Sequence, residues 1–337
     1  MVIIIKEDKP MFDITKGYIN EPTPSGDALK NAINQLKKEK NAVIMAHYYQ
    51  PGDIQDIADF VGDSLALAQR AAKTEADIIV LSGVHFMGET AKILSPDKKV
   101  LVPDLNAGCS LADSCPADQF AEFLQDHPDH TVISYVNTTA AVKSYTDIVV
   151  TSTNAKAIVD SLPADEKIVF GPDRNLGNYI NSITGRNMVL WDGACHVHEE
   201  FSLEKILELK KKFPEADVIA HPECKKVILH IADFIGSTAA LIKHTASSEK
   251  KQFIVVTESG VIHEMRKRSP EKNFIPAPPN DSTCACNECN FMRLNTLSKL
   301  YNCLKYEQPE ILVDEEIRIK AVQPIKRMLE ISEKLGL

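Results

Sequence analysis

The sequence lacks the short motifs that mark several large enzyme classes. It contains no G-x-G-x-x-G run, which excludes the usual dinucleotide-binding turn, and neither a G-x-S-x-G nucleophile turn nor an H-E-x-x-H zinc helix. Residues 83–88 have the glycine spacing of a phosphate-binding loop, but Glu89 stands where that loop needs a lysine and would repel phosphate. The chemistry of the chain must therefore come from other residues.

The chain also lacks a long apolar run and an excess of positive charge. The apolar segment 2–5 is too short for a signal peptide, and no run approaches the roughly 18 residues of a membrane span. The net charge is −9 and no basic block offsets it, so we expect neither nucleic acid nor a membrane as partner. We expect a cytoplasmic protein, in which the eight cysteines are more typical of metal ligands or catalytic groups than of disulfides.

What the sequence does contain is a repeated alternation of short apolar runs and helix-like stretches. Short strands separated by helices indicate parallel sheets covered on both faces, an α/β fold. Helical spacing covers residues 27–38, 53–72, 201–212, 239–243 and 261–267. The predicted strands are 42–45, 78–81, 100–102, 131–133, 148–150, 168–170, 189–190, 218–220, 234–235 and 253–256.

Three cysteines recur once in each of three comparable blocks of strands and helices. Cys195 lies in W-D-G-A-C-H-V-H-E (191–199), between an apolar run and a helix-like run. Cys109, Cys195 and Cys289 have the spacing of three similar α/β units that face a common centre. Any one of these cysteines could instead be an ordinary buried core residue without a metal. For Cys303, which lies in the middle of a predicted helix, this core role is the better interpretation.

The segment 284–289 combines Cys284, Cys286 and Cys289 as C-x-C-x-x-C. Its C-x-x-C half by itself suggests zinc or a redox pair, but no second half completes a structural zinc site. Further ligands must come from distant parts of the chain, and Cys109 and Cys195 supply one thiol each. A 4Fe-4S cluster on three thiolates keeps one iron open, which can act as a Lewis acid.

Polar side chains gather just after the predicted strands, where α/β proteins place their ligands. A single histidine there is more often a satisfied core residue, but this concentration at equivalent strand ends favours a shared pocket for a small polyanion. Gly236, Ser237 and Thr238 open a helix and suit a phosphate or carboxylate, although a simple N-cap explains them equally well. The candidates are His47, Tyr49, Tyr135, Asn137, Ser152, His221, Glu223, Ser237 and Thr238.

Several stretches resemble the quinolinate synthase family, in the right order from about residue 41 to the C-terminus. They are A-H-Y-Y-Q (46–50), G-D-S-L (62–65), G-V-H-F-M-G-E-T-A-K-I-L (83–94), P-D-L-N-A-G-C-S-L-A-D-S-C (103–115), S-Y-V-N-T (134–138), T-S-T-N-A (151–155), H-P-E-C (221–224), G-S-T (236–238), T-E-S-G (257–260) and C-N-F-M-R-L-N-T-L (289–297).

The resemblance implies a transferase of de novo NAD biosynthesis, which condenses iminoaspartate with dihydroxyacetone phosphate to quinolinate and releases phosphate and water. It implies three αβα domains related by pseudo-threefold symmetry around a 4Fe-4S cluster, held by Cys109, Cys195 and Cys289 with one open iron site. L-aspartate oxidase is the implied functional partner, as the source of the unstable iminoaspartate. The predicted domains are residues 22–107 with 290–337, residues 108–193 and residues 194–289.

The resemblance also assigns roles to the strand-end residues. Tyr49, His221 and Glu223 are expected to be catalytic, and we expect burial to raise the pKa of Glu223 so that it can act as a general base. Some family members carry C-x-x-C-x-x-C where this chain has C-x-C-x-x-C, so no redox pairing is carried over to Cys284 and Cys286. The expected substrate ligands are His47, Ser64, Tyr135, Asn137, Ser152, His221, Glu223, Ser237 and Thr238.

Two other functions stay open at this point. One is an iron–sulfur hydro-lyase that acts on another hydroxy acid, which would need neither an amine nor a phosphate in its substrate. The other is a non-catalytic iron–sulfur sensor, which usually has a DNA-binding or partner-binding segment. No such segment is evident in the sequence.

Overall fold

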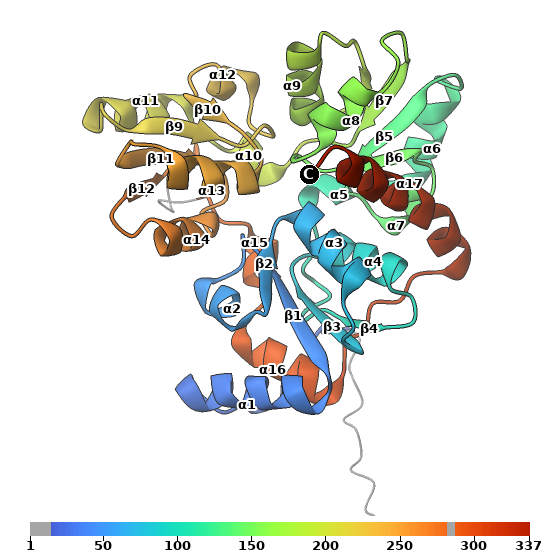
Figure 1. The fold of residues 1–337 in the computed structure, drawn as a ribbon, viewed down its shortest axis with the longest axis vertical. Helices are drawn as coiled ribbons and strands as arrows, with labels where there is room; N and C mark the ends of the chain where they lie inside the picture. Colours follow the sequence, from blue (N-terminus) through green and yellow to red (C-terminus); the bar gives the residue numbers. More distant parts are fainter. Residues whose placement is uncertain (1–14, 282–286) are drawn as a thin grey trace, which may run out of the picture.

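The computed structural model describes residues 15–281 and 287–337. Within these ranges the chain forms three sheets of four parallel strands, each with its own helices, arranged around a common centre (Figure 1). The α/β fold with three related units is therefore confirmed. The predicted apolar segment 2–5 and the two cysteines Cys284 and Cys286 lie outside the described residues.

The three sheets share one strand order, in which the first strand of each unit lies between the second and the third. The first sheet holds, in spatial order, β2 (Phe60–Gly62), β1 (Ala42–His47), β3 (Ile78–Ser82) and β4 (Lys99–Leu101). The second holds β6 (Ile148–Val150), β5 (Thr131–Tyr135), β7 (Ile168–Gly171) and β8 (Val189–Leu190). The third holds β10 (Phe234–Ile235), β9 (Asp217–Ala220), β11 (Gln252–Val256) and β12 (Asn273–Pro276).

Helices cover the sheets and connect the strands. Those of the first unit are α1 (Gly26–Glu39), α2 (Gly52–Ile57), α3 (Ser64–Lys73) and α4 (His85–Leu94). The second unit has α5 (Ser110–Asp113), α6 (Ala117–Gln125), α7 (Ala140–Lys143), α8 (Ala155–Ser161) and α9 (Arg174–Thr184). The third has α10 (His196–Glu199), α11 (Leu203–Lys212), α12 (Lys226–Leu229), α13 (Thr238–Ser247) and α14 (Val261–Arg268), and the chain ends with α15 (Asn290–Arg293), α16 (Leu297–Tyr306) and α17 (Glu315–Lys334).

The predicted helix over residues 53–72 is wrong, because the structure divides it into α2, β2 and α3. Phe60 and Val61 pair with β1 as an edge strand. Asp63 then starts α3, since its carboxylate accepts a hydrogen bond from the backbone N–H of Ala66 at 3.0 Å and satisfies a free donor of the helix end. The edge strand β12 was also absent from the prediction.

One aspartate per unit fixes the register between the first and second strands. Each precedes the second strand, and its carboxylate accepts a hydrogen bond from a backbone N–H of the first strand. Its own backbone N–H donates to the carbonyl of the same first-strand residue. We call this pair of hydrogen bonds the aspartate clamp. It occurs once in each of the three units, and it was not predicted from the sequence. The pairs are Asp59 with Ile44, Asp147 with Val132 and Asp233 with Val218, each at 2.8 Å.

The two long C-terminal helices pack on different units. Helix α16 lies against α1 and β3, whereas α17, drawn in dark red, packs against β6, α7 and α4 (Figure 1). The side-chain amide of Asn154 donates to the hydroxyl of Ser332 at 2.9 Å and ties α17 to the second unit. The predicted domain boundaries assign α17 to the first domain and stay a prediction. No helix in the described ranges combines the length and the hydropathy that crossing a membrane requires.

The clamp predicts a measurable loss of stability. Asp147→Ala removes the acceptor for the Val132 N–H and should lower the free energy of unfolding by about 1 kcal/mol, the usual net value of one hydrogen bond. Urea unfolding of the purified protein measures this difference. Asp160→Ala is the control, because Asp160 only pairs with Lys156 on an exposed helix face, and its effect should stay below about 0.5 kcal/mol. Equal stability of the two variants would contradict the clamp.

Candidate active site

One cavity of about 360 Å³ lies where the carboxyl ends of the three sheets meet. Its volume suits a small ligand, and its wall takes side chains from all three units. Ser237 is not in the lining, because its hydroxyl caps α13 by accepting from the N–H of Ala240. The predicted residues that do line the cavity are His47, Tyr49, Ser64, Cys109, Tyr135, Asn137, Ser152, Cys195, His221, Glu223, Thr238 and Cys289.

Each unit presents two side chains, two residues apart, where its first strand ends. In the first and third units the backbone turns directly after the strand, where the N–H of Gln50 donates to the carbonyl of His47 and that of Cys224 to the carbonyl of His221, each at 3.0 Å. Both members of each pair line the cavity. The three loops occupy equivalent places in equivalent sheets, which brings six polar side chains together. The pairs are His47 with Tyr49, Tyr135 with Asn137, and His221 with Glu223.

The two histidines of these pairs are neutral and held in one tautomer. The Nδ1 atom of His47 accepts from the N–H of Tyr49 at 3.1 Å, and Nδ1 of His221 accepts from the N–H of Glu223 at 3.4 Å. The proton of each ring is thereby assigned to Nε2, which in His221 lies 3.2 Å from the hydroxyl of Ser152. Burial lowers the pKa of His47 to about 4 and that of His221 to about 3, against the opposing charge of Glu223.

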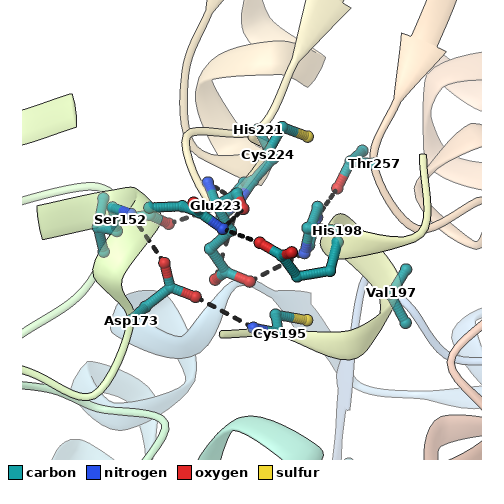
Figure 2. Close-up of polar contacts among 12 residues, drawn as sticks. Ser152, Asp173, Cys195, Val197, His198, His221, Glu223, Cys224 and Thr257 are labelled. Atoms are coloured by element: carbon teal, nitrogen blue, oxygen red, sulfur yellow. Dashed lines mark hydrogen bonds and ion pairs between the residues drawn. The ribbon is translucent and has the colours of Figure 1, made fainter. Parts of the chain in front are cut away.

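His198 lies at the centre of the hydrogen-bond network in the cavity wall (Figure 2). Its Nε2 atom lies 3.0 Å from the hydroxyl of Thr257, and its Nδ1 atom lies 2.9 Å from Oε2 of Glu223. The hydroxyl of Tyr135 donates to the other carboxylate oxygen, Oε1, at 2.5 Å. The carboxylate is thus held between the second and third units.

Tyr49 extends this network to the first unit. Its hydroxyl lies 2.9 Å from that of Thr257 and 2.8 Å from that of Thr238. Burial, and next the charge of Glu223, raise its pKa well above the usual value, so the phenol keeps its proton. A continuous chain of polar groups therefore runs from Thr238 to Tyr135 through all three units.

The expected rise in the pKa of Glu223 is wrong. Burial does raise this pKa, but the adjacent His198 lowers it, and so does the hydrogen bond from Tyr135. The net pKa lies well below the ordinary value for a glutamate, because Oε2 lies 2.9 Å from Nδ1 of His198 and Oε1 accepts from the phenol of Tyr135. Glu223 is therefore a buried anion rather than a base held ready by a raised pKa.

The three predicted metal ligands are free thiols in the same cavity wall. Burial raises the pKa of Cys109 to about 12, and the nearby Cys289 adds to this effect. Burial, and next the charge of Glu223, raise the pKa of Cys195 well above its usual value, and burial also raises that of Cys289. A bound cationic centre would reverse this by stabilising thiolates, so these three thiols, one after the last strand of each sheet, fit a metal cluster in their donor chemistry.

Comparison with known proteins bears on the same residues. The model of the family described as quinolinate synthetase A protein matches residues 31–330. The curated quinolinate synthases of Chloroherpeton thalassium and Thermosynechococcus vestitus are 59% and 60% identical over 301 residues, which is 89% of this chain and 94% of each relative. That of Synechocystis is 61% identical over 304 residues, 90% of this chain and 95% of the relative.

The chain belongs to the quinolinate synthase family. This confirms the resemblance seen in the sequence. It also means that the polar cavity and the three thiols belong to a chain with the quinolinate synthase fold over almost its whole length.

Sequence reasoning about this family member missed several cavity residues. His198 lies one helical turn after Cys195, a spacing that places both on one side of a short helix. Its ligand atom lies within 4.8 Å of those of Cys195 and Glu223, a set that could hold one metal ion. Glu258 follows β11 and accepts from the N–H of Cys289 at 3.2 Å and from Arg293 at 2.9 Å, so it positions the third thiol.

The network predicts the effect of removing its bridging hydroxyl. Tyr49→Phe removes the phenol hydroxyl that contacts the hydroxyls of Thr238 and Thr257. The buried hydroxyl of Thr238 then loses this partner, and the hydrogen-bond network ends at Thr257. The free energy of unfolding should fall by about 1–3 kcal/mol, as measured in urea. Tyr145→Phe is the matched control, because that ring is 47% exposed, and it should change stability by less than about 0.5 kcal/mol. An unchanged unfolding curve for Tyr49→Phe would show that the bridge does not hold the units together.

Proposed function

We propose that this chain is a quinolinate synthase, which condenses iminoaspartate with dihydroxyacetone phosphate to quinolinate and releases phosphate and water. The proposal includes a 4Fe-4S cluster on Cys109, Cys195 and Cys289. Its main support is that these three thiols and the Tyr49, His198 and Glu223 network line a single cavity. The names of the relatives support the same activity and its place in NAD biosynthesis.

When bound, such a cluster supplies a Lewis-acidic iron with an open position for a hydroxyl or carboxylate of the substrate. The protein supplies hydrogen-bond donors for the anionic groups. Neutral His47 and His221 can donate from Nε2, and the hydroxyls of Ser64, Ser152 and Thr238 come from the first, second and third units. We assign to these residues the substrate carboxylates and phosphate.

The ionisable groups of the network differ in their protonation state. Tyr49 and Tyr135 keep their phenolic protons and are not bases, whereas Glu223 remains ionised and lies against His198. We assign proton transfer to this network, in which His198 links the Glu223 carboxylate to Thr257 and, through that hydroxyl, to Tyr49. An L-aspartate oxidase remains the expected source of iminoaspartate.

The ligand assignment predicts three equivalent losses. Cys109→Ser, Cys195→Ser and Cys289→Ser should each abolish the brown colour and the iron and sulfide content of about four per chain after anaerobic purification. Cys303→Ser should retain them, because Cys303 is buried in α16 and is not among the residues of the cavity lining. A full complement in any of the first three variants, or a wild-type protein with one zinc and no iron, would refute the cluster.

The charge of Glu223 predicts a selective loss of turnover. Glu223→Gln keeps the shape and an acceptor for Tyr135 but removes the anion that faces His198. Quinolinate formation should fall by roughly 10²–10⁴-fold, with the iron content close to wild type. Glu199→Gln is the control, since Glu199 pairs with Arg174 and Asn175 outside the cavity lining and should keep activity within about twofold. Near wild-type turnover of Glu223→Gln would make Glu223 a structural residue.

A further inference from the structure

Lys143, the last residue of α7, is completely buried. A lysine is almost never fully buried unless its charge is paired. In the part of the chain that the structure describes, no carboxylate lies within 4.0 Å of its ammonium group. The Nζ atom instead donates to the carbonyl oxygens of Val136, at 2.8 Å, and Thr138, and lies 5.4 Å from the centre of the Phe86 ring.

These contacts place the ammonium directly behind the cavity wall. Val136 and Thr138 flank Asn137, which lines the cavity, and Phe86 lines it too. The side-chain oxygen of Asn137 is buried and has no hydrogen-bond partner among the described residues. A buried acceptor without a partner points to a ligand donor or a water in the cavity. Lys143 thus holds the peptide groups on both sides of a residue that faces the ligand space.

In the first unit, a neutral side chain donates to the two carbonyls that flank the equivalent cavity residue. The side-chain amide of Gln55 donates to the carbonyls of Tyr48, at 2.9 Å, and Gln50, at 2.8 Å, which flank Tyr49 in the equivalent loop. A neutral amide is therefore sufficient to hold such a loop, and it avoids the cost of burying an ammonium group. The positive charge of Lys143 needs another explanation.

The charges around the cavity explain why a positive charge would be useful at this position. The described lining of the cavity includes the carboxyl groups of Asp63, Glu223 and Glu258 but no lysine or arginine, although the proposed substrates carry carboxylates and a phosphate. Burial lowers the pKa of Lys143 to about 8, against the charge of Glu89, so the ammonium stays mostly protonated at neutral pH. The ammonium lies behind the cavity wall, because it donates to the carbonyls on both sides of Asn137 and lies 5.4 Å from the centre of the Phe86 ring.

We propose that Lys143 is a positioning residue whose positive charge favours anionic ligands in the cavity, acting through the Asn137 loop without touching them. The identity of those ligands rests on the proposed function. The charge would offset part of the repulsion that the carboxylate of Glu223 exerts on an incoming anion.

The test compares two buried lysines of the same kind in the iron-loaded protein. Lys272 also donates to two carbonyls, those of Thr245 and Ser248, and lies 5.7 Å from the Phe253 ring, but it is not in the cavity lining or behind it. Anaerobic calorimetry should measure the dissociation constants of quinolinate and of inorganic phosphate. Lys143→Gln should weaken both about tenfold, the effect of one charge acting across a protein wall, whereas Lys272→Gln should change them by less than about twofold.

Two further measurements separate the charge from a structural role. Lys143→Gln should melt at or above the wild-type temperature, because a buried charge has been removed. Lys143→Met removes the charge and the two hydrogen bonds, and should bind anions at least as weakly as Lys143→Gln. If Lys143→Gln binds both anions like wild type, the proposal is overturned, since the side chain then only holds the loop.

The outcome is independent of the proposed reaction. Wild-type protein that binds phosphate but forms no quinolinate would refute the proposed function, while a tenfold loss of phosphate affinity in Lys143→Gln would still support the role of Lys143. Wild-type protein that forms quinolinate, with a Lys143→Gln variant of unchanged affinity, would leave the function standing and refute the role of Lys143. Wild-type protein that binds neither anion would overturn both.

Discussion

The meeting of three carboxyl edges is the constraint on which the rest of this molecule depends. A parallel sheet covered by helices on both faces has no polar face, so its polar side chains collect where the strands end. Asp59 and Asp147 each hold the second strand of a unit against the first by a hydrogen bond. The loops that follow the first strands contribute side chains to one common cavity. Since no sheet alone encloses a cavity, the site exists only when all three units are in place.

Burial in that cavity determines the charge state of each group. Glu223 stays ionised because His198 and the phenol of Tyr135 lie against its carboxylate, and its charge then adds to burial in raising the pKa values of Tyr135 and Cys195. The phenols and thiols are therefore protonated and the histidines of the strand-end pairs neutral. In the described lining, no lysine or arginine offsets the charge of Glu223.

Several errors of the sequence reading share one cause. Residues 53–72 have helical spacing, but β2 forms inside them because Phe60 and Val61 pair with a strand some fifteen positions earlier in the chain. Glu223 follows a strand and a proline, which suggested a base with a raised pKa, yet the imidazole that keeps it ionised comes from α10. A local pattern contains no information about such a partner, because the interaction forms only after the units pack.

Ten of the twelve described strands, the α/β class, the family and the recurring cysteines follow from the sequence alone, because apolar runs, motifs and spacing are properties of neighbouring residues. Only the tertiary structure decided that Ser237 caps a helix while Thr238 lines the cavity, and that His198 joins Thr257 to Glu223. It also revealed the buried ammonium of Lys143 behind Asn137. These features depend on distances between units that are far apart in the chain, and a charge or a hydrogen bond acts through distance in space rather than separation in sequence.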